Sequence, residues 1–318
     1  MTKIKIKITC YSLLFSSLAT TSANEIQDYN IYHQQVIEAE KFIASGKYDS
    51  ALLVFERLFN DYDFVFLSEY QIASQLSLYL NDNQKAINYL KQGISSGWKL
   101  KSIKKNAYLK PLLKGEEWKS VKKEYPNLKK DYESNLNKKI REQVKKMYSK
   151  DQRKALKALF RFSSKAQDKY AERKFAPHSE KQMNDFSKIL QTHGYPGEKL
   201  IGNNYWMSTI ISHHNSISTA YAQKDRLYPN LIPQLKESLK NGQISPYEFA
   251  GMDDWYLTVK YDRTKPTYGI LNPPSRSNLL ETDELRKTIY ARPYELREAL
   301  IAIQKKTGMN FYLSDRWY

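Results

Sequence analysis

The chain has 318 residues, 41% of them hydrophobic and 27% charged, which is enough apolar material for two domains and excludes a disordered polymer. Its single cysteine, Cys10, excludes a disulfide framework and cysteine-ligated metal sites. The formal net charge of +17 favours anionic partners, such as nucleic acid, anionic lipid or an acidic polymer. Glycine is scarce, with 11 residues, so the composition predicts a mainly α fold.

Residues 1–23 have the pattern of an export signal. Lysines at positions 3, 5 and 7 precede a short apolar stretch from Ile8 to Ala19, and Thr21-Ser22-Ala23 offers small residues for cleavage. The apolar stretch is far shorter than the roughly 20 residues that a membrane-spanning helix needs. The alternative is an N-terminal strand, because lysine and isoleucine alternate from Lys3 to Lys7. We expect cleavage after Ala23 and a periplasmic or secreted protein without a transmembrane segment.

Residues 24–134 contain a repeated helical pattern. The segment from Gly46 to Leu52 returns as the segment from Asn81 to Ile87, and Ala51 and Ala86 open apolar-periodic stretches 35 positions apart. A period near about 34 residues, with a small residue after a polar turn, is typical of tetratricopeptide arrays. This part therefore resembles the tetratricopeptide-repeat family, which implies stacked helical hairpins and a protein or peptide partner on their surface. A helical bundle without a ligand groove is the alternative.

The positive charge is concentrated between Lys99 and Lys174, where 25 Lys and Arg residues face 9 Asp and Glu residues. Such a segment is suited to electrostatic docking on an anionic envelope surface. The alternative is a set of lysine-rich helices whose charges are simply solvated. No motif that reads RNA or DNA accompanies the charge, so nucleic acid is not expected as a partner.

Residues 135–318 predict a second helical domain with a small β-hairpin. A helix is expected from Asn203 to Arg226, and another starts at Ser245-Pro246-Tyr247-Glu248, which is a capping box with proline at the first helical position. Trp255 to Tyr261 then alternates aromatic and β-branched residues, and Thr267 to Leu271 follows a turn-like stretch. This alternation is typical of two paired strands.

The sequence has no phosphate loop, dinucleotide fingerprint, zinc-protease motif or nucleophile elbow. The best catalytic candidates are His213, His214, Asp254 and Tyr268, because a histidine held near a carboxylate can act as a general acid or base. His213 lies on the apolar stripe of its helix, and His214 lies about 100° around it, which is poor geometry for a two-histidine metal site. We expect no metal and no cofactor. A buried, purely structural histidine is the alternative, and in either case we expect one imidazole to be buried in contact with Asp254 and Tyr268.

Five short motifs carry a second resemblance. The first, Met147-Tyr148-Ser149-Lys150-Asp151-Gln152, is similar to Met-x-x-x-Asp-Gln; the others are His193–Gly197 with Gly202, His213-His214, Ala250–Asp254 and Tyr268-Gly269. In this order they resemble an uncharacterised bacterial family, domain of unknown function 6624, over residues 135–294. Trp255 stands where that family has Arg, and Ile270-Leu271 where it has Thr-Gln. The family has no assigned reaction, so the resemblance implies architecture and candidate positions only.

These observations favour a non-catalytic function: an exported helical-repeat interaction or scaffold protein. The first alternative is a hydrolase-like enzyme in the C-terminal domain that uses His213 or His214 with Asp254. The second alternative is electrostatic docking to an anionic envelope surface through Lys99–Lys174.

Overall fold

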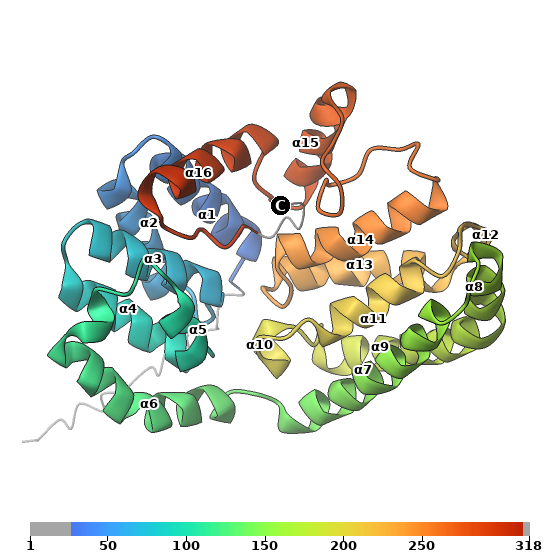
Figure 1. Ribbon diagram of the computed structural model, residues 1–318, viewed down its shortest axis with the longest axis horizontal. Helices are drawn as coiled ribbons and strands as arrows, with labels where there is room; N and C mark the ends of the chain where they lie inside the picture. Colours follow the sequence, from blue (N-terminus) through green and yellow to red (C-terminus); the bar gives the residue numbers. More distant parts are fainter. Residues whose placement is uncertain (1–26, 314–318) are drawn as a thin grey trace, which may run out of the picture.

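The computed structural model describes residues 27–313, which form helices and loops without a strand among them (Figure 1). The predicted mainly α class is confirmed. The predicted export signal of residues 1–23, including Cys10, lies outside the described residues. Within the described range, no helix combines the length and the apolar character that crossing a membrane requires.

The first half consists of helical hairpins. The helices are α1 (Tyr29–Ala44), α2 (Tyr48–Asp61), α3 (Leu67–Tyr79), α4 (Asn83–Ser95), α5 (Leu100–Lys105), the 3-10 turn η1 (Leu112–Lys114) and α6 (Glu116–Ser134). α1 packs on α2, and α3 packs on α4. Both hairpin turns contain a residue in the left-handed region, Gly46 with φ 73° and Asn81 with φ 61°. Ala51 and Ala86 are fully buried at the matching positions of α2 and α4.

The second half begins with α7, the long helix in Figure 1. Its elements are α7 (Lys138–Leu159), α8 (Ser164–Tyr170), the π-helical turn η2 (Ala171–Phe175), α9 (Ala176–His193), α10 (Glu198–Ile201), α11 (Trp206–Asn215), α12 (Thr219–Lys224), α13 (Leu227–Lys240), α14 (Pro246–Lys260), the 3-10 turn η3 (Arg276–Asn278), α15 (Leu279–Thr288) and α16 (Tyr294–Thr307). α11 packs against α7, α9 and α14, so it is the central helix of this half.

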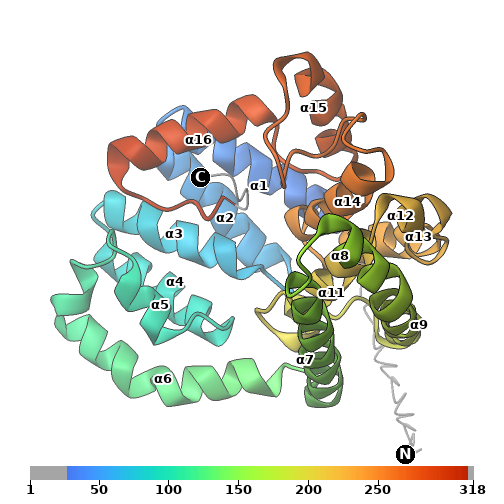
Figure 2. The same ribbon diagram turned by 45° about the vertical axis from the view of Figure 1, so that its right-hand side comes forward.

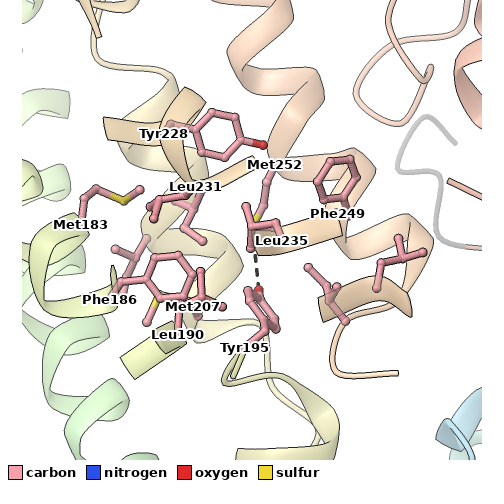
Figure 3. Close-up of a cluster of buried hydrophobic side chains, with 14 of the residues drawn as sticks. Met183, Phe186, Leu190, Tyr195, Met207, Tyr228, Leu231, Leu235, Phe249 and Met252 are labelled. Atoms are coloured by element: carbon pink, nitrogen blue, oxygen red, sulfur yellow. Dashed lines mark hydrogen bonds between the residues drawn. The ribbon is translucent and has the colours of Figure 1, made fainter. Parts of the chain in front are cut away.

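The core of the second half lies between α9, α11, α13 and α14 (Figure 3). Phe186, Leu235 and Phe249 are fully buried in it. The hydroxyl of Tyr195 points to the sulfur of Met252, at 3.8 Å, so the polar end of this buried ring has a partner. Each fully buried aliphatic or aromatic side chain of this kind contributes about 1.5–3 kcal/mol through the area that it removes from water.

The chain then returns to the first half. α16 packs on α1, and both ribbon views place it beside the helices of the first half (Figures 1 and 2). Leu300 of α16 and Phe311 are buried in the same core as the first two hairpins. The amide of Gln75 on α3 exchanges two hydrogen bonds of 2.8 Å with the backbone of Asn310. The end of the described chain therefore completes the N-terminal core.

One ion pair joins the two halves inside the protein. Arg292 donates to both carboxylate oxygens of Glu40 on α1, from Nε at 2.9 Å and from Nη2 at 2.5 Å, and both side chains are buried. The ring of Tyr247 on α14 lies 4.4 Å from the Arg292 guanidinium carbon. The pair therefore ties α1 to the chain that leads into α16.

The predicted β-hairpin is wrong: Trp255 to Lys260 continue α14, and residues 267–271 form a loop. The predicted capping box does start α14, because the Glu248 N–H donates to Ser245 Oγ at 3.2 Å. Once begun, this helix buries Met252 and Tyr256 at helical spacing in the core. This packing outweighs the β propensity of the aromatic and β-branched residues, which depends strongly on context.

The expected helix from Asn203 to Arg226 is interrupted. α11 ends at Asn215, and Ser218 starts α12 by accepting a hydrogen bond from the Tyr221 N–H at 3.1 Å. Serine competes for backbone hydrogen bonds in this way, which makes it a helix start rather than a helix interior residue. The break ends α11 directly after the two histidines.

We expect Phe186→Ala to lower the free energy of unfolding by about 3–5 kcal/mol, because it leaves a cavity in the core of the second half. Phe162→Ala is the matched control, since its ring is fully exposed and its loss should change stability by no more than about 0.5 kcal/mol. Urea unfolding followed by circular dichroism measures both. Equal effects of the two substitutions would contradict this assignment of the core.

Candidate functional site

A cavity of about 690 Å³ opens beside α11 and α14. Its walls come from α11, α14, the loop after α14 and the segment after α16. The residues that line it include Ser208, Ser212, His213, Tyr247, Glu248, Ile270, Leu271 and Tyr312. The two halves of the chain therefore both contribute to it, since Tyr312 lies on the N-terminal helices. The surface of the cavity is partly polar, as a site for a small ligand requires.

His213 and Asp151 form a hydrogen-bonded pair at this cavity. His213 Nδ1 lies 2.5 Å from Asp151 Oδ2; the imidazole side chain is 31% exposed, whereas the carboxylate is completely buried. A carboxylate only accepts hydrogen bonds, so Nδ1 donates to Asp151, and in the neutral form of the ring the other nitrogen, Nε2, is an acceptor. Among residues 27–313, Asp151 is the hydrogen-bond partner of this ring. This is the arrangement of a base oriented by a carboxylate.

The sequence positions Asp151 through the helical repeat of α7. Ile140, Val144 and Met147 are buried on one stripe, and Asp151 follows at the next position of the same stripe. Because α7 packs on α11, this stripe brings the carboxylate to His213. Sequence reasoning missed Asp151 as a site residue, although a charged residue at a core position of an amphipathic helix was a usable signal.

The carboxylate of Asp151 has a second oxygen without a partner. Oδ1 is buried, and no hydrogen bond reaches it from the described residues. An unsatisfied buried oxygen costs about 1–3 kcal/mol, and such groups concentrate at functional sites. His178 lies nearby, and burial lowers the pKa of its imidazole below the ordinary value, so it is neutral at pH 7.

His214 has a different environment. Its Nδ1 lies 3.0 Å from Ser179 Oγ and its Nε2 lies 3.1 Å from Asp225 Oδ2. The side chains of His214, Ser179 and Asp225 are all nearly inaccessible to water. The three residue types are those of a catalytic triad, but a serine hydroxyl with no exposed surface cannot reach a substrate. The set satisfies both nitrogens of a buried ring and is structural.

Asp254 organises a loop. Its carboxylate accepts hydrogen bonds from the backbone N–H groups of Tyr268 (2.6 Å), Ile270 (2.6 Å) and Leu271 (3.2 Å). Burial raises the pKa of Asp254 to about 6, although these hydrogen bonds favour the ionised form. Arg286 donates to the carbonyl of Tyr268 at 2.7 Å, from the other side of the loop. Asp254 and Arg286 thereby fix the loop that carries Ile270 and Leu271 into the cavity wall.

The predicted site residues are thus only partly brought together. One imidazole, that of His214, is buried as expected, but no hydrogen bond within the described part of the chain joins either histidine to Asp254 or Tyr268. Asp254 contacts Tyr268 through the backbone. The Tyr268 hydroxyl is buried near Asp253, and burial raises its pKa. The hydrogen bonds of the two histidines go instead to Asp151 on α7 for His213, and to Ser179 on α9 and Asp225 for His214.

Comparisons with known proteins add no assignment: no family model, curated protein or solved structure matches the chain. The resemblances to tetratricopeptide repeats and to domain of unknown function 6624 therefore stay predictions. Two pairs of motifs from the second resemblance are joined by hydrogen bonds: Asp151 of the first motif bonds His213 of the third, and Asp254 of the fourth bonds Tyr268 of the fifth. Residues 27–313 hold no group of three or more metal-ligating side chains.

Ser179→Ala should lower the free energy of unfolding by about 1–3 kcal/mol, because the buried Nδ1 of His214 loses its hydrogen-bond donor. Ser149→Ala is the control: its hydroxyl is exposed on α7, and its removal should change stability by no more than about 0.5 kcal/mol. Chemical denaturation measures both.

The contribution of the Ser179–His214–Asp225 cluster to the free energy of unfolding should depend on pH. Burial alone would raise the pKa of Asp225, but hydrogen bonds from His214 and from the Leu227 N–H outweigh it and hold the pKa below its ordinary value. A carboxyl with a lowered pKa stabilises the native state above its unfolded-state pKa, and this contribution disappears as the pH falls through the folded-state pKa. Asp225→Asn should therefore cost stability at pH 7 and progressively less below about pH 4. A penalty that stays constant from pH 7 to that range would contradict the assignment.

Proposed function

We propose that the cavity at His213 is a hydrolytic active site, in which His213 is the general base and Asp151 holds its ring. The observation that carries this proposal is the 2.5 Å contact between His213 Nδ1 and the buried Asp151 carboxylate at the wall of the cavity. A water molecule bound to Nε2 would transfer a proton to it while its oxygen attacks an electrophilic carbon or phosphorus, and the imidazolium would then give that proton to the leaving group as the bond to that group breaks. The imidazolium that forms would be stabilised by Asp151.

Polar groups around the base support this function. Ser208, Ser212 and Tyr247 line the same cavity and offer hydroxyl groups for holding a substrate. Asp254 acts indirectly, because its carboxylate fixes the loop that forms this side of the cavity. We therefore retain the hydrolase-like enzyme that the sequence suggested, with Asp151 instead of Asp254 as the carboxylate that orients the histidine.

The packing of the first half favours this enzyme over a scaffold. Met309 and Phe311 pack into the core of the hairpins, α16 covers α1, and Asn310 is bonded to α3. These faces of α1 and α3 are thus occupied by the protein's own chain. A partner-binding role for the hairpins, which the repeat resemblance suggests, would have to use their other faces.

His213→Gln should reduce hydrolysis about 10²- to 10⁴-fold, the usual contribution of a general base, while leaving the fold intact. The assay compares hydrolysis of a panel of chromogenic carboxylic esters, phosphate esters and glycosides by the wild type and the variant. Asp151→Asn should lower the rate as well. The control is Ser149→Ala, which removes an exposed hydroxyl of α7 outside the cavity and should leave the rate unchanged. Any panel substrate that His213→Gln hydrolyses at the wild-type rate counts against the proposal.

A second function is favoured by one surface patch. Leu156, Phe160 and Phe162 are 52%, 71% and 107% exposed at the end of α7 and just after it. Positively charged side chains surround them; we call the set the basic–aromatic patch, and its charged members are Lys150, Arg153, Lys154, Lys157 and Arg161. Exposed aromatic side chains among Lys and Arg fit the interface of an anionic membrane. We propose docking to anionic lipid through this patch.

Elsewhere on α7 the basic segment has a solvated face. Lys138, Lys139, Lys145 and Lys146 are exposed, without large exposed apolar side chains beside them. The positive charge of residues 99–174 is therefore widespread, whereas the combination of charge with exposed rings is local. This contrast supplies the control for a test of docking.

Phe160→Ser with Phe162→Ser should abolish most binding to vesicles that contain anionic lipid, because the rings supply the apolar part of the affinity. Replacing Lys138, Lys139, Lys145 and Lys146 by Gln should weaken binding less, and Leu280→Ser, an exposed apolar residue outside the patch, should leave it unchanged. Co-sedimentation measures binding, which should be lost on neutral vesicles and at about 1 M salt, where the Debye length is about 3 Å. Equal binding of the Phe160/Phe162 variant and the wild type would remove this function.

A further inference from the structure

A second cavity, of about 310 Å³, lies at the junction of the two halves. It is lined by α1 and α3 from the first half and by α10, α14 and the residues around Arg292 from the second. We call it the junction cavity. Tyr205, Ser245, Tyr247, Glu248 and Tyr312 line both this cavity and the one at His213. The two cavities are therefore neighbours, and these side chains form part of the wall of each.

Carboxyl groups dominate the charge of the junction cavity. Glu69, Glu198 and Glu248 line it from α3, α10 and α14. Each has one oxygen engaged by a neutral donor: Ser68 Oγ at 2.7 Å, the Leu67 N–H at 2.7 Å and the Tyr195 hydroxyl at 2.8 Å, respectively. The fourth carboxylate, that of Glu40, is already paired with Arg292. Within the described residues, no lysine lines this cavity.

Ionising three carboxyl groups in one cavity without a matching cation costs free energy, and this cost raises their pKa values. Burial raises the pKa of Glu69 to about 7, of Glu198 to about 8 and of Glu248 to about 7. Desolvation disfavours the charged form of a carboxyl unless a nearby cation stabilises it. The cavity thus has unused affinity for a positive group.

Two further polar groups at this cavity have no partner. His33 Nε2 and Arg292 Nη1 are buried and make no hydrogen bond within residues 27–313, and their side chains are only 5% and 4% exposed. Burial lowers the pKa of His33 to about 3, so its ring is neutral. Unpaired buried polar atoms are rare in native proteins, and a bound ligand is one way to satisfy them. Arg292 Nη1 can only donate, so it requires an oxygen acceptor.

We propose that the junction cavity binds a small organic ligand through its protonated primary amine, with Glu69, Glu198 and Glu248 as the anionic partners and Arg292 Nη1 as a donor to a ligand oxygen. A lysine side chain within a short peptide has this chemistry. Tyr205 and Tyr247 also line this cavity and add aromatic surface to its wall, which can contact the alkyl chain of such a ligand. Because the two cavities share five wall residues, we expect a bound amine to lie next to the His213 cavity, and an amine-bearing compound is then the substrate class expected there; this last step alone rests on the proposed function.

The test uses two probes that differ only in the amine: N-acetyl-lysine amide and N-acetyl-norleucine amide. By isothermal titration calorimetry at pH 8, the lysine probe should bind the full-length protein roughly 10- to 100-fold more tightly, the range expected for charge-assisted hydrogen bonds. Glu198→Gln and Glu69→Gln should each weaken its binding about 10-fold or more. Glu281→Gln, an exposed glutamate outside the cavity, should have no effect.

Binding should also release protons. Below about pH 6 the three carboxyls are neutral, and above about pH 8 they are ionised, while the lysine amine stays protonated until about pH 10. Affinity should therefore rise from pH 6 to pH 9, and at pH 7 the binding heat should change with the ionisation heat of the buffer. Among the other groups that line the cavity, burial lowers the pKa of His33 to about 3 and raises that of Tyr247 to about 12, and Arg292 is paired with Glu40, which raises the pKa of Arg292.

The outcomes separate the two proposals. Equal affinity of the two probes, no binding of the lysine probe at millimolar concentration, or no proton release would overturn the amine site, and the wild-type measurements decide this even if a glutamate variant fails to fold. Tight lysine binding together with undiminished hydrolysis by His213→Gln would leave the amine site standing and remove the base. Loss of hydrolysis in His213→Gln, together with no binding of the lysine probe, would support His213 as the base and overturn the amine site.

Discussion

The buried ion pair between Glu40 and Arg292 is the contact on which the arrangement of the two halves depends. It links residues 252 positions apart, and both partners are hidden from water. Replacing such a pair by apolar residues often costs nothing, but removing one partner leaves a buried charge and costs about 3–5 kcal/mol. The pair therefore specifies one way of docking the halves. The junction cavity exists only in that docking, because its walls come from both sides.

From this ion pair a chain of polar contacts leads to the cavity at His213. The carbonyl oxygen of Arg292 accepts a hydrogen bond from Arg286 Nη1 at 3.1 Å, and Arg286 Nε donates to the Tyr268 carbonyl. The Asp254 carboxylate accepts hydrogen bonds from backbone N–H groups of the same loop. A buried polar network that is well satisfied is rigid. Asp254 and Tyr268, which the sequence analysis gave as catalytic candidates, thus belong to the loop beside this cavity.

The sequence predicted the local structure well and the long-range pairing poorly. The mainly α class and the start of α14 followed from composition and from the Ser245 capping box, which act over a few residues. The β-hairpin failed because tertiary packing decided the state of Trp255 to Lys260. The pairing of Asp151 with His213 spans 62 positions and depends on how α7 crosses α11. Helical periodicity tells which face of each helix is buried, but it does not tell which two faces meet.

The charge of the protein has opposite signs outside and inside. The net charge is +17 and the exposed face of α7 is rich in lysine, whereas the junction cavity collects carboxyl groups. At physiological ionic strength the field of surface lysines is screened within about 8 Å, while groups in a cavity interact through protein and are screened much less. Basic side chains thus dominate the exterior, whereas carboxyl groups dominate the junction cavity. A ligand that carries an amine meets little long-range attraction on approach, so its affinity has to come from desolvated contacts with Glu69, Glu198 and Glu248, which act only once it has entered.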